Sequence, residues 1–361
     1  MPVLYWALIA MQLEKQALPF CVQPRFVPRL WGVRELGEIY RGRKQEAEPI
    51  GETWLTANDC AAGAEGESLQ QVLSRDRDQL MGLPRYAGDD FPVLVKFLFP
   101  ADRLSVQVHP GDDYAGRHGL GRGKTEMWHV LAAQPGARLG VNLRPEVKMA
   151  EFAAACRAGR GAECLEWQSA RAGDTFYIPA GTIHAIGPGL VICEIQQQSD
   201  NTFRLDDYGR LGADGRPRQL HWEHGFAVAR PHAGGGKLNR DAQAEGLLVN
   251  CRYFRVEKYR LENTSQPLAP GKMHVLAALT EGLRLEKASR SAIASDSPGR
   301  SKTVSMSAGK PEAAMESHVS PLGLTRGSCA VLPAGSAAGW ELAGRGLCLC
   351  LDVTLPANLE G

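Results

Sequence analysis

Four side chains with the chemistry of metal ligands lie at spacings that let them converge: Gln107, His109, Glu126 and His184. Side chains alternate between the two faces of a β-strand, so Gln107 and His109 point the same way in the strand-like segment 104–110. Two neutral imidazoles and one carboxylate suit zinc or another divalent ion and leave a position open for substrate. The residues therefore predict one divalent-metal site, in which the amide oxygen of Gln107 is the weakest donor.

A turn, rather than strand alternation, brings His184 to this site. The run 173–184 reads Gly-x5-Pro-x-Gly-x2-His, with Pro179 and Gly181 placed to form a tight turn. One strand is expected to end at this turn, and His184 then begins the next strand.

Glu126 lies on a third alternating segment. Alternation places Lys124, Glu126 and Trp128 on the face toward the site and turns His129 away from it. A lysine facing the site can bind a phosphate or act in proton transfer. The glycine-rich residues 110–124 are expected to form a loop at the mouth of the site.

Several segments resemble known sugar-phosphate isomerases. The run 173–184 matches the second motif of cupin barrels. Other segments resemble the class I mannose-6-phosphate isomerases, in their short bacterial form and in that family's order: 29–32, 49–54, 96–110, 123–128 and 194–204. The resemblance covers residues 24–232 and continues more weakly to the end of the chain. It implies that Gln107, His109, Glu126 and His184 bind one Zn²⁺ ion per chain.

The same resemblance makes Arg204 the active-site arginine. A fixed guanidinium can stabilise the anion that forms when a carbon beside a carbonyl loses its proton. Glu194 and Asp200 lie near Arg204 in the sequence, and either can orient it or carry protons. Lys124, Glu194 and Asp200 are all candidates for the general base, and the sequence does not rank them.

Two further positions belong to the expected neighbourhood of the site. Lys96 lies within the apolar run 91–99, so if it is buried it needs a partner such as a carboxylate. Glu52 and Trp54 fall in a segment that the resembled family places near its pocket.

The implied reaction interconverts mannose 6-phosphate and fructose 6-phosphate through a metal-stabilised enediol. One alternative keeps the fold and changes the sugar phosphate, for example to glucose 6-phosphate, because His129 replaces an aromatic residue expected in this family. A second is an iron-dependent cupin oxygenase, against which Gln107 and the isomerase-like segments count. A third is a sugar-sensing cupin without enzymatic activity, but neither a helix-turn-helix segment nor a basic patch is found.

Composition limits the partners and the compartment. The chain has 361 residues and a net charge of +1, which gives no indication of nucleic-acid or membrane-surface binding. The nine cysteines contain no Cys-x-x-Cys pair, so reduced thiols in a cytoplasmic protein are expected. The apolar segment 3–11 is too short to span a membrane. We interpret it as an over-long translation start, with a signal peptide as the alternative. A monomer or a homodimer is expected.

The fold class expected is mainly β, a double cupin of two jelly-roll barrels with a few short helices. Helical spacing predicts a helix within 67–81, and Pro145 favours a second one that ends before Gly159. The run 91–99 predicts a buried strand.

An internal repeat predicts the second barrel. Segment 126–139 is echoed by 271–285, and the Gly-x5-Pro-x-Gly motif recurs at 327–335. In this alignment Gly271 takes the place of Glu126, so the second barrel is expected to hold no metal. The expected divisions are an extension 1–23, a catalytic domain 24–240 with small helical insertions, and a second barrel 241–361 with a mobile loop around 287–320.

Overall fold

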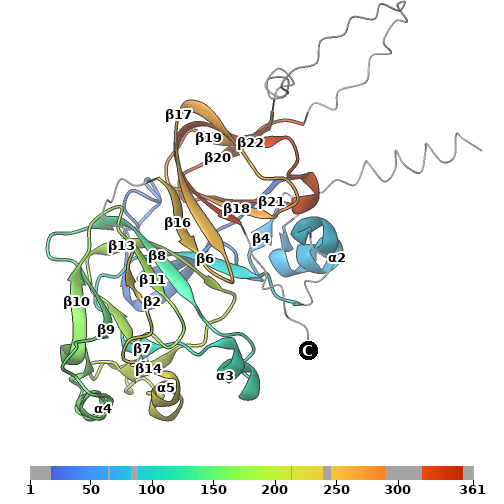
Figure 1. Cartoon of the computed structure of the whole chain (residues 1–361). Coiled ribbons are helices and arrows are strands. Elements are labelled where there is room, and N and C mark those ends of the chain that lie inside the picture. Colours follow the sequence, from blue (N-terminus) through green and yellow to red (C-terminus); the bar gives the residue numbers. More distant parts are fainter. Residues whose placement is uncertain are drawn as a thin grey trace, which may run out of the picture.

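The computed structural model describes residues 18–63, 66–82, 88–212, 214–238, 245–288 and 319–352. They form two packed β-barrels with a few short helices, as Figure 1 shows, and this confirms the predicted fold class. Most of the expected extension 1–23 and of the expected mobile loop 287–320 lies outside the described residues. None of the described helices is long and apolar enough to cross a membrane.

The first barrel consists of two antiparallel sheets that face each other. The larger sheet has the order β15 (Gly236–Lys237), β11 (Thr175–Ile178), β8 (Glu126–Ala133), β13 (Leu190–Gln197), β6 (Val93–Leu98), β3 (Ile50–Trp54) and β2 (Arg25–Val33). The smaller sheet has the order β10 (Leu165–Ser169), β9 (Arg138–Leu143), β12 (His184–Ile186), β7 (Val106–Val108) and β14 (Phe203–Asp206). Trp128, Leu139 and Phe176 are among the side chains that fill the space inside.

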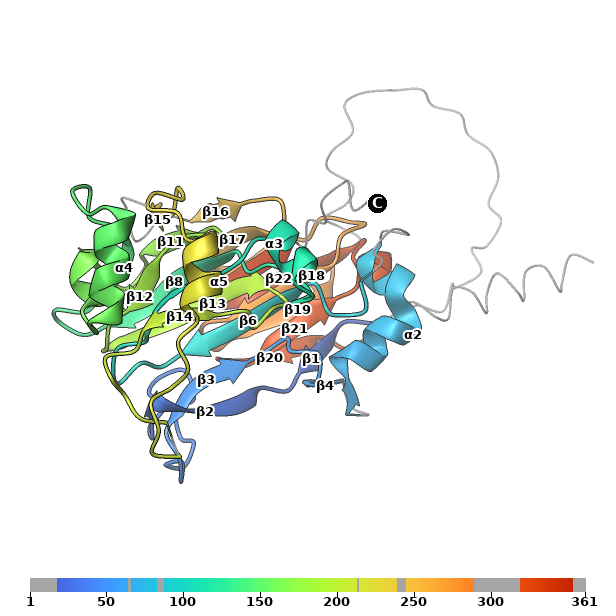
Figure 2. The same ribbon diagram turned by 90° about the horizontal axis from the view of Figure 1, so that it is seen from below.

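The second barrel is built on one extended sheet. Its order is β16 (Gly246–Asn250), β17 (Arg255–Pro267), β22 (Trp340–Asp352), β18 (His274–Ala278), β21 (Cys329–Leu332), β1 (Phe20–Val22), β4 (Ala61–Ala62) and β5 (Glu67–Ser68), and β19 (Leu283–Lys287) joins β22 to β20 (Leu322–Leu324). The N-terminal strand β1 thus pairs with β21, far along the chain, and Figure 2 shows the two side by side.

One apolar cluster joins the barrels and explains the apolar run 91–99. Val93, Val95 and Phe97 of β6 pack in the same cluster as Val275 and Leu349 of the second barrel. Every residue of β6 is buried, because one face of the strand lines the first barrel and the other meets the second. A strand covered on both faces carries a nearly continuous apolar sequence.

One helix lies where the sequence predicts it, and two others differ from the prediction. The helix α2 (Leu69–Met81) begins with a capping box between Ser68 and Gln71, within the range that helical spacing predicts. The helix α4 (Met149–Arg157) begins four residues after Pro145, because the backbone N–H of Lys148 donates to Glu151 and starts the helix there.

The second difference lies in 110–124, which contains the short helix α3 (Asp112–Arg117) and is not only a loop. Two aspartates in its first turn and an arginine in its last complement the helix dipole. Asp112 also accepts hydrogen bonds from the backbone of Gly123 and from the side chains of Gln197 and Tyr253. These long-range contacts hold α3 in place.

The other helical segments are α5 (Trp222–Val228), η1 (Gly161–Cys164) and η3 (Ala334–Ser336).

The two barrels contain equivalent strands, as the internal repeat predicts. The residues that occupy equivalent positions in these strands differ from those that the sequence alignment matches. Ile178 and Leu332 each precede the proline of a Gly-x5-Pro motif. Ile178 pairs with Glu126, and Leu332 pairs with His274. The position that matches Glu126 in the second barrel is therefore His274 rather than Gly271.

Candidate metal centre

The four predicted ligands come from both sheets of the first barrel. His184 begins β12 and pairs directly with Gln107 of β7, while His109 follows β7. Glu126 begins β8 in the opposite sheet. Two facing sheets and one turn therefore bring together residues that lie up to 77 positions apart in the chain.

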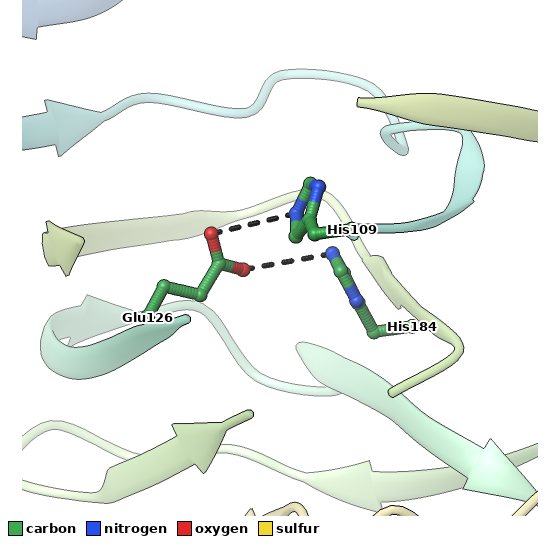
Figure 3. A group of neighbouring side chains, drawn as sticks. All are labelled: His109, Glu126 and His184. Carbon is green, nitrogen blue, oxygen red and sulfur yellow. Dashed lines mark ion pairs between the residues drawn. The ribbon is translucent and has the colours of Figure 1, made fainter. Parts of the chain in front are cut away.

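The two imidazoles present their Nε2 atoms to the carboxylate of Glu126, as Figure 3 shows. Nε2 of His109 lies 3.5 Å from Oε2, and Nε2 of His184 lies 3.6 Å from Oε1. Nδ1 of His109 lies 2.9 Å from the carbonyl of Asn201, and Nδ1 of His184 lies 2.9 Å from that of Thr182. Each Nδ1 therefore carries the proton and donates it, which leaves both Nε2 lone pairs directed at the centre.

The electrostatics of this cluster favour a bound cation. Burial and the neighbouring His109 lower the pKa of His184 to about 3, so its imidazole is neutral. Burial alone raises the pKa of Glu126, but Lys124 and then His109 outweigh it and hold that pKa well below its usual range. Oε1 of Glu126 is buried and accepts no hydrogen bond within the described part of the chain. Two neutral imidazoles and an ionised carboxylate fit a divalent ion.

Lys124 and Gln107 complete the immediate surroundings. The ammonium of Lys124 contacts Oε2 of Glu126 and lies 3.0 Å from Nε2 of His109, so the predicted placement of Lys124 beside Glu126 is confirmed. The amide nitrogen of Gln107 lies 3.1 Å from Nε2 of His184, and its oxygen accepts from Ser105. Gln107 can bind a metal through its oxygen only if its amide group flips. The flip exchanges the amide oxygen and the amide nitrogen, which are nearly equal in size.

Gln107 and Lys124 also line an adjacent cavity of about 410 Å³, whose wall includes all four predicted catalytic residues. His109, Glu126 and His184 are buried behind this wall and are not among its lining residues. Lys124 and Glu194 are buried in its wall, Arg204 is half-buried, and Asp200 is exposed at its edge. The cavity is rich in charge of both signs. Its other charged lining residues are Arg29, Glu52, Lys96 and Arg218.

Buried ion pairs organise the wall formed by β3, β6 and β13. Nζ of Lys96 lies 3.3 Å from Oε2 of Glu194, which confirms that the buried lysine has a carboxylate partner. The indole of Trp128 donates to the other oxygen of Glu194 at 3.0 Å. Burial and the charge of Glu126 raise the pKa of Glu194. Glu52 accepts from Arg29 and Trp54 and faces the same cavity.

Arginines dominate the opposite rim. Arg204 donates to the backbone carbonyl of Gln219 and has no carboxylate in salt-bridge range among the described residues. Burial and the neighbouring Arg218 lower its pKa. Asp207 is buried and accepts hydrogen bonds from both Arg218 and Arg210. The sequence alone gives no signal that places Arg218 at the cavity, because only the folded loop after β14 brings it there.

His129 points away from the centre, as strand alternation predicts. Its Nδ1 lies 2.9 Å from the hydroxyl of Thr175, and burial and then Lys258 lower its pKa to about 4. It therefore lies neutral near the interface between the barrels and does not contact the cavity.

The fold and the site define a double-barrel cupin with a donor set for a divalent cation. No protein-family model matches the chain. The chain is 34% identical over 280 residues to mannose-6-phosphate isomerase ManA of Bacillus subtilis, which covers 73% of this chain and 86% of that protein. It is 32% identical over 261 residues to mannose-6-phosphate isomerase of Streptococcus mutans, covering 69% and 80% of the two chains.

Solved structures agree at the level of the fold. The crystal structure of the mannose 6-phosphate isomerase from Bacillus subtilis superposes with a TM-score of 0.71 at 23% identity, over 93% of this chain and 99% of that one. The chain belongs to the class I mannose-6-phosphate isomerase family.

Proposed function

We propose that the protein is an aldose–ketose isomerase that interconverts mannose 6-phosphate and fructose 6-phosphate with one Zn²⁺ held by His109, His184, Glu126 and Gln107. The observation that carries this proposal is the convergence of two Nε2 lone pairs on an ionised carboxylate, beside a charged cavity that Gln107 and Lys124 line. The names of the related proteins give the sugar.

The reaction moves one proton between adjacent carbons. The base removes the proton from C2 of the aldose and returns it to C1, while the hydroxyl proton passes between the two oxygens. The intermediate is an enediol with negative charge on oxygen. A bound divalent ion supplies Lewis-acid stabilisation of that charge, worth several kcal/mol. The guanidinium of Arg204, which has no carboxylate partner among the described residues, adds a fixed positive charge at the same cavity.

Three residues remain candidates for the base. Glu194 has a raised pKa, which brings it closer to the neutral range where a general acid–base works best. Lys124 contacts two of the ligands directly, and Asp200 lies at the open edge of the cavity. Glu194→Gln, Lys124→Met and Asp200→Asn, compared by solvent hydrogen exchange at C2, separate these roles. Only loss of the base stops exchange while sugar binding persists.

The phosphate is proposed to bind at the arginine rim. A sugar phosphate brings nearly two negative charges, which planar guanidinium groups bind with two hydrogen bonds each. Arg218 is oriented toward this cavity by Asp207, and Lys124 offers a further positive charge deeper in it.

The test is a coupled isomerase assay on mannose 6-phosphate and on glucose 6-phosphate. Protein stripped by a chelator is expected to lose activity on mannose 6-phosphate and to regain it on reloading with zinc. His184→Ala abolishes turnover and keeps the fold, whereas the exposed His232→Ala serves as a matched control and stays near wild type. Activity on glucose 6-phosphate alone changes the assignment to another sugar phosphate. Full activity after complete metal removal refutes the metal role.

A further inference from the structure

The second barrel contains its own group of metal-ligating side chains. His274 lies on β18, and Cys350 and Asp352 lie on the neighbouring strand β22. Nδ1 of His274, Sγ of Cys350 and a carboxylate oxygen of Asp352 all lie within 4.8 Å of one another, and all three residues are buried. The cluster therefore places a nitrogen, a sulfur and an oxygen donor around one point.

Strand register places this cluster where the first barrel has its own site. In the first barrel Glu126 pairs with Ile178 on one side and with Gln196 on the other. In the second, His274 pairs with Leu332 and with Asp352. His274 thus matches the ligand Glu126. Cys350, two residues before Asp352, then matches Glu194, which is two residues before Gln196.

The hydrogen bonds of His274 direct a lone pair into the cluster. Its Nε2 lies 2.8 Å from the carbonyl oxygen of Ala269, so Nε2 carries a proton and donates it. In a neutral imidazole the other nitrogen, Nδ1, is then unprotonated. That nitrogen lies 2.7 Å from Oδ1 of Asp352 and 3.8 Å from Sγ of Cys350. Two lone pairs in such contact repel each other unless a proton or a metal cation lies between them.

We propose that His274, Cys350 and Asp352 form a second divalent-metal site, of the zinc type, which links β18 to β22 inside the second barrel. A metal-bound imidazole donates its other N–H to a carboxylate, a backbone carbonyl or water, and here the carbonyl of Ala269 takes that place. Thiolate, imidazole and carboxylate together favour zinc over magnesium or calcium. Binding opens the contact between Nδ1 and Oδ1 slightly, since both atoms then lie about 2 Å from one ion.

The charged neighbours are compatible with an ion at this point. Nζ of Lys272 lies 3.5 Å from the other oxygen of Asp352, and its side chain is half exposed, so the carboxylate lies close to solvent. Glu257 pairs with Cys350 on the adjacent strand and is held by Arg255 and Tyr259. The site uses none of the residues of the first centre, so it does not depend on the proposed isomerase activity.

Metal counting tests the proposal directly. Zinc per chain is measured after exhaustive dialysis for the wild type, Cys350→Ser and Asp352→Asn. Cys348→Ser is the matched control, because Cys348 is an equally buried thiol on the same face of β22 outside the cluster. The wild type and Cys348→Ser are expected to hold one more zinc ion per chain than the other two variants. All four are expected to keep isomerase activity, which also shows that they fold.

Cobalt provides an optical measurement specific to the second site. The first centre has only nitrogen and oxygen donors, so a thiolate-to-cobalt charge-transfer band in the near ultraviolet reports Cys350 alone. The band is expected in wild type, His184→Ala and Cys348→Ser, and absent in Cys350→Ser. Equal zinc content in wild type and Cys350→Ser, with no such band, overturns the proposal and leaves the cluster as an ion pair between protonated His274 and Asp352. Neither result changes if the first centre acts on a different sugar.

Discussion

Removal of the positive charge of Lys96 tests how the cavity wall is held together. Lys96 is only 3% exposed, and its Nζ lies 3.3 Å from Glu194. At an effective dielectric constant of about 20, this separation corresponds to an attraction of about 5 kcal/mol, before the cost of taking both ions out of water. Lys96→Met keeps most of the volume and leaves Glu194 buried, where the indole of Trp128 still donates a hydrogen bond to its carboxylate.

Lys96→Met is expected to lower the free energy of unfolding by about 3 kcal/mol at the upper end of the pH range. Breaking a buried ion pair typically costs about 3–5 kcal/mol. The value lies near the lower limit because Glu194, whose pKa burial and Glu126 already raise, can take up a proton when its lysine is gone. A carboxyl group with a raised pKa in the folded state binds more protons than in the unfolded state. The loss of stability is therefore smallest at a pH below the pKa that Glu194 has in the unfolded state. It grows as the pH rises through the pKa that Glu194 has in the folded state.

Guanidinium unfolding at about pH 5 and about pH 8, with metal at one fixed concentration, measures this difference. The exposed lysine in Lys44→Met loses the same charge and should change the unfolding free energy by no more than about 0.5 kcal/mol. The double variant Lys96→Met with Glu194→Gln removes both charges and should recover most of the loss. If Lys96→Met costs no more than Lys44→Met at either pH, the pair does not hold the wall together.

Three further substitutions test the rim and the loop before the centre. Arg204→Ala should keep the metal content but lower kcat by about 10²–10³, measured by metal analysis beside the isomerase assay; a near wild-type kcat contradicts its role. Asp207→Asn should raise KM for the sugar phosphate by about tenfold with little change in kcat, because Arg218 loses its bidentate partner; an unchanged KM places the phosphate elsewhere. Gly123→Ala should lower activity, since its Cβ would lie 2.5 Å from the backbone nitrogen of Asp112, and normal activity with an unchanged melting temperature shows that the loop adapts.

Local chemistry made part of the site predictable. The alternation that aligns Gln107 with His109, and the turn that delivers His184, are fixed by a few consecutive residues. Lys96 in an apolar run required a partner, but the sequence could not identify Glu194. Their contact depends on the antiparallel pairing of β6 with β13, about a hundred residues apart, which only long-range register defines.

The same limit explains the helices that the sequence misplaced. Pro145 is a favourable first residue for a helix, but Lys148 and Glu151 form a competing start that local propensity does not rank. The helix α3 has only six residues, and contacts from Gln197 and Tyr253 hold its first residue, Asp112. A helix of this length is not stable on its own, so its existence depends on partners that are distant in sequence.

The repeat shows most clearly why register matters for function. The five residues His-Val-Leu-Ala-Ala occur in both β8 and β18, so a sequence alignment places His129 on His274. In the structure His129 faces the interface between the barrels, whereas His274 faces the interior of its own barrel beside Cys350. A strand buried on both faces carries no polar face to reveal which side is inner, and a shift of one residue exchanges the two sides. Only the pairing with β21 and β22 identifies His274 as the counterpart of Glu126, and this pairing gives the second barrel donor atoms that the alignment conceals.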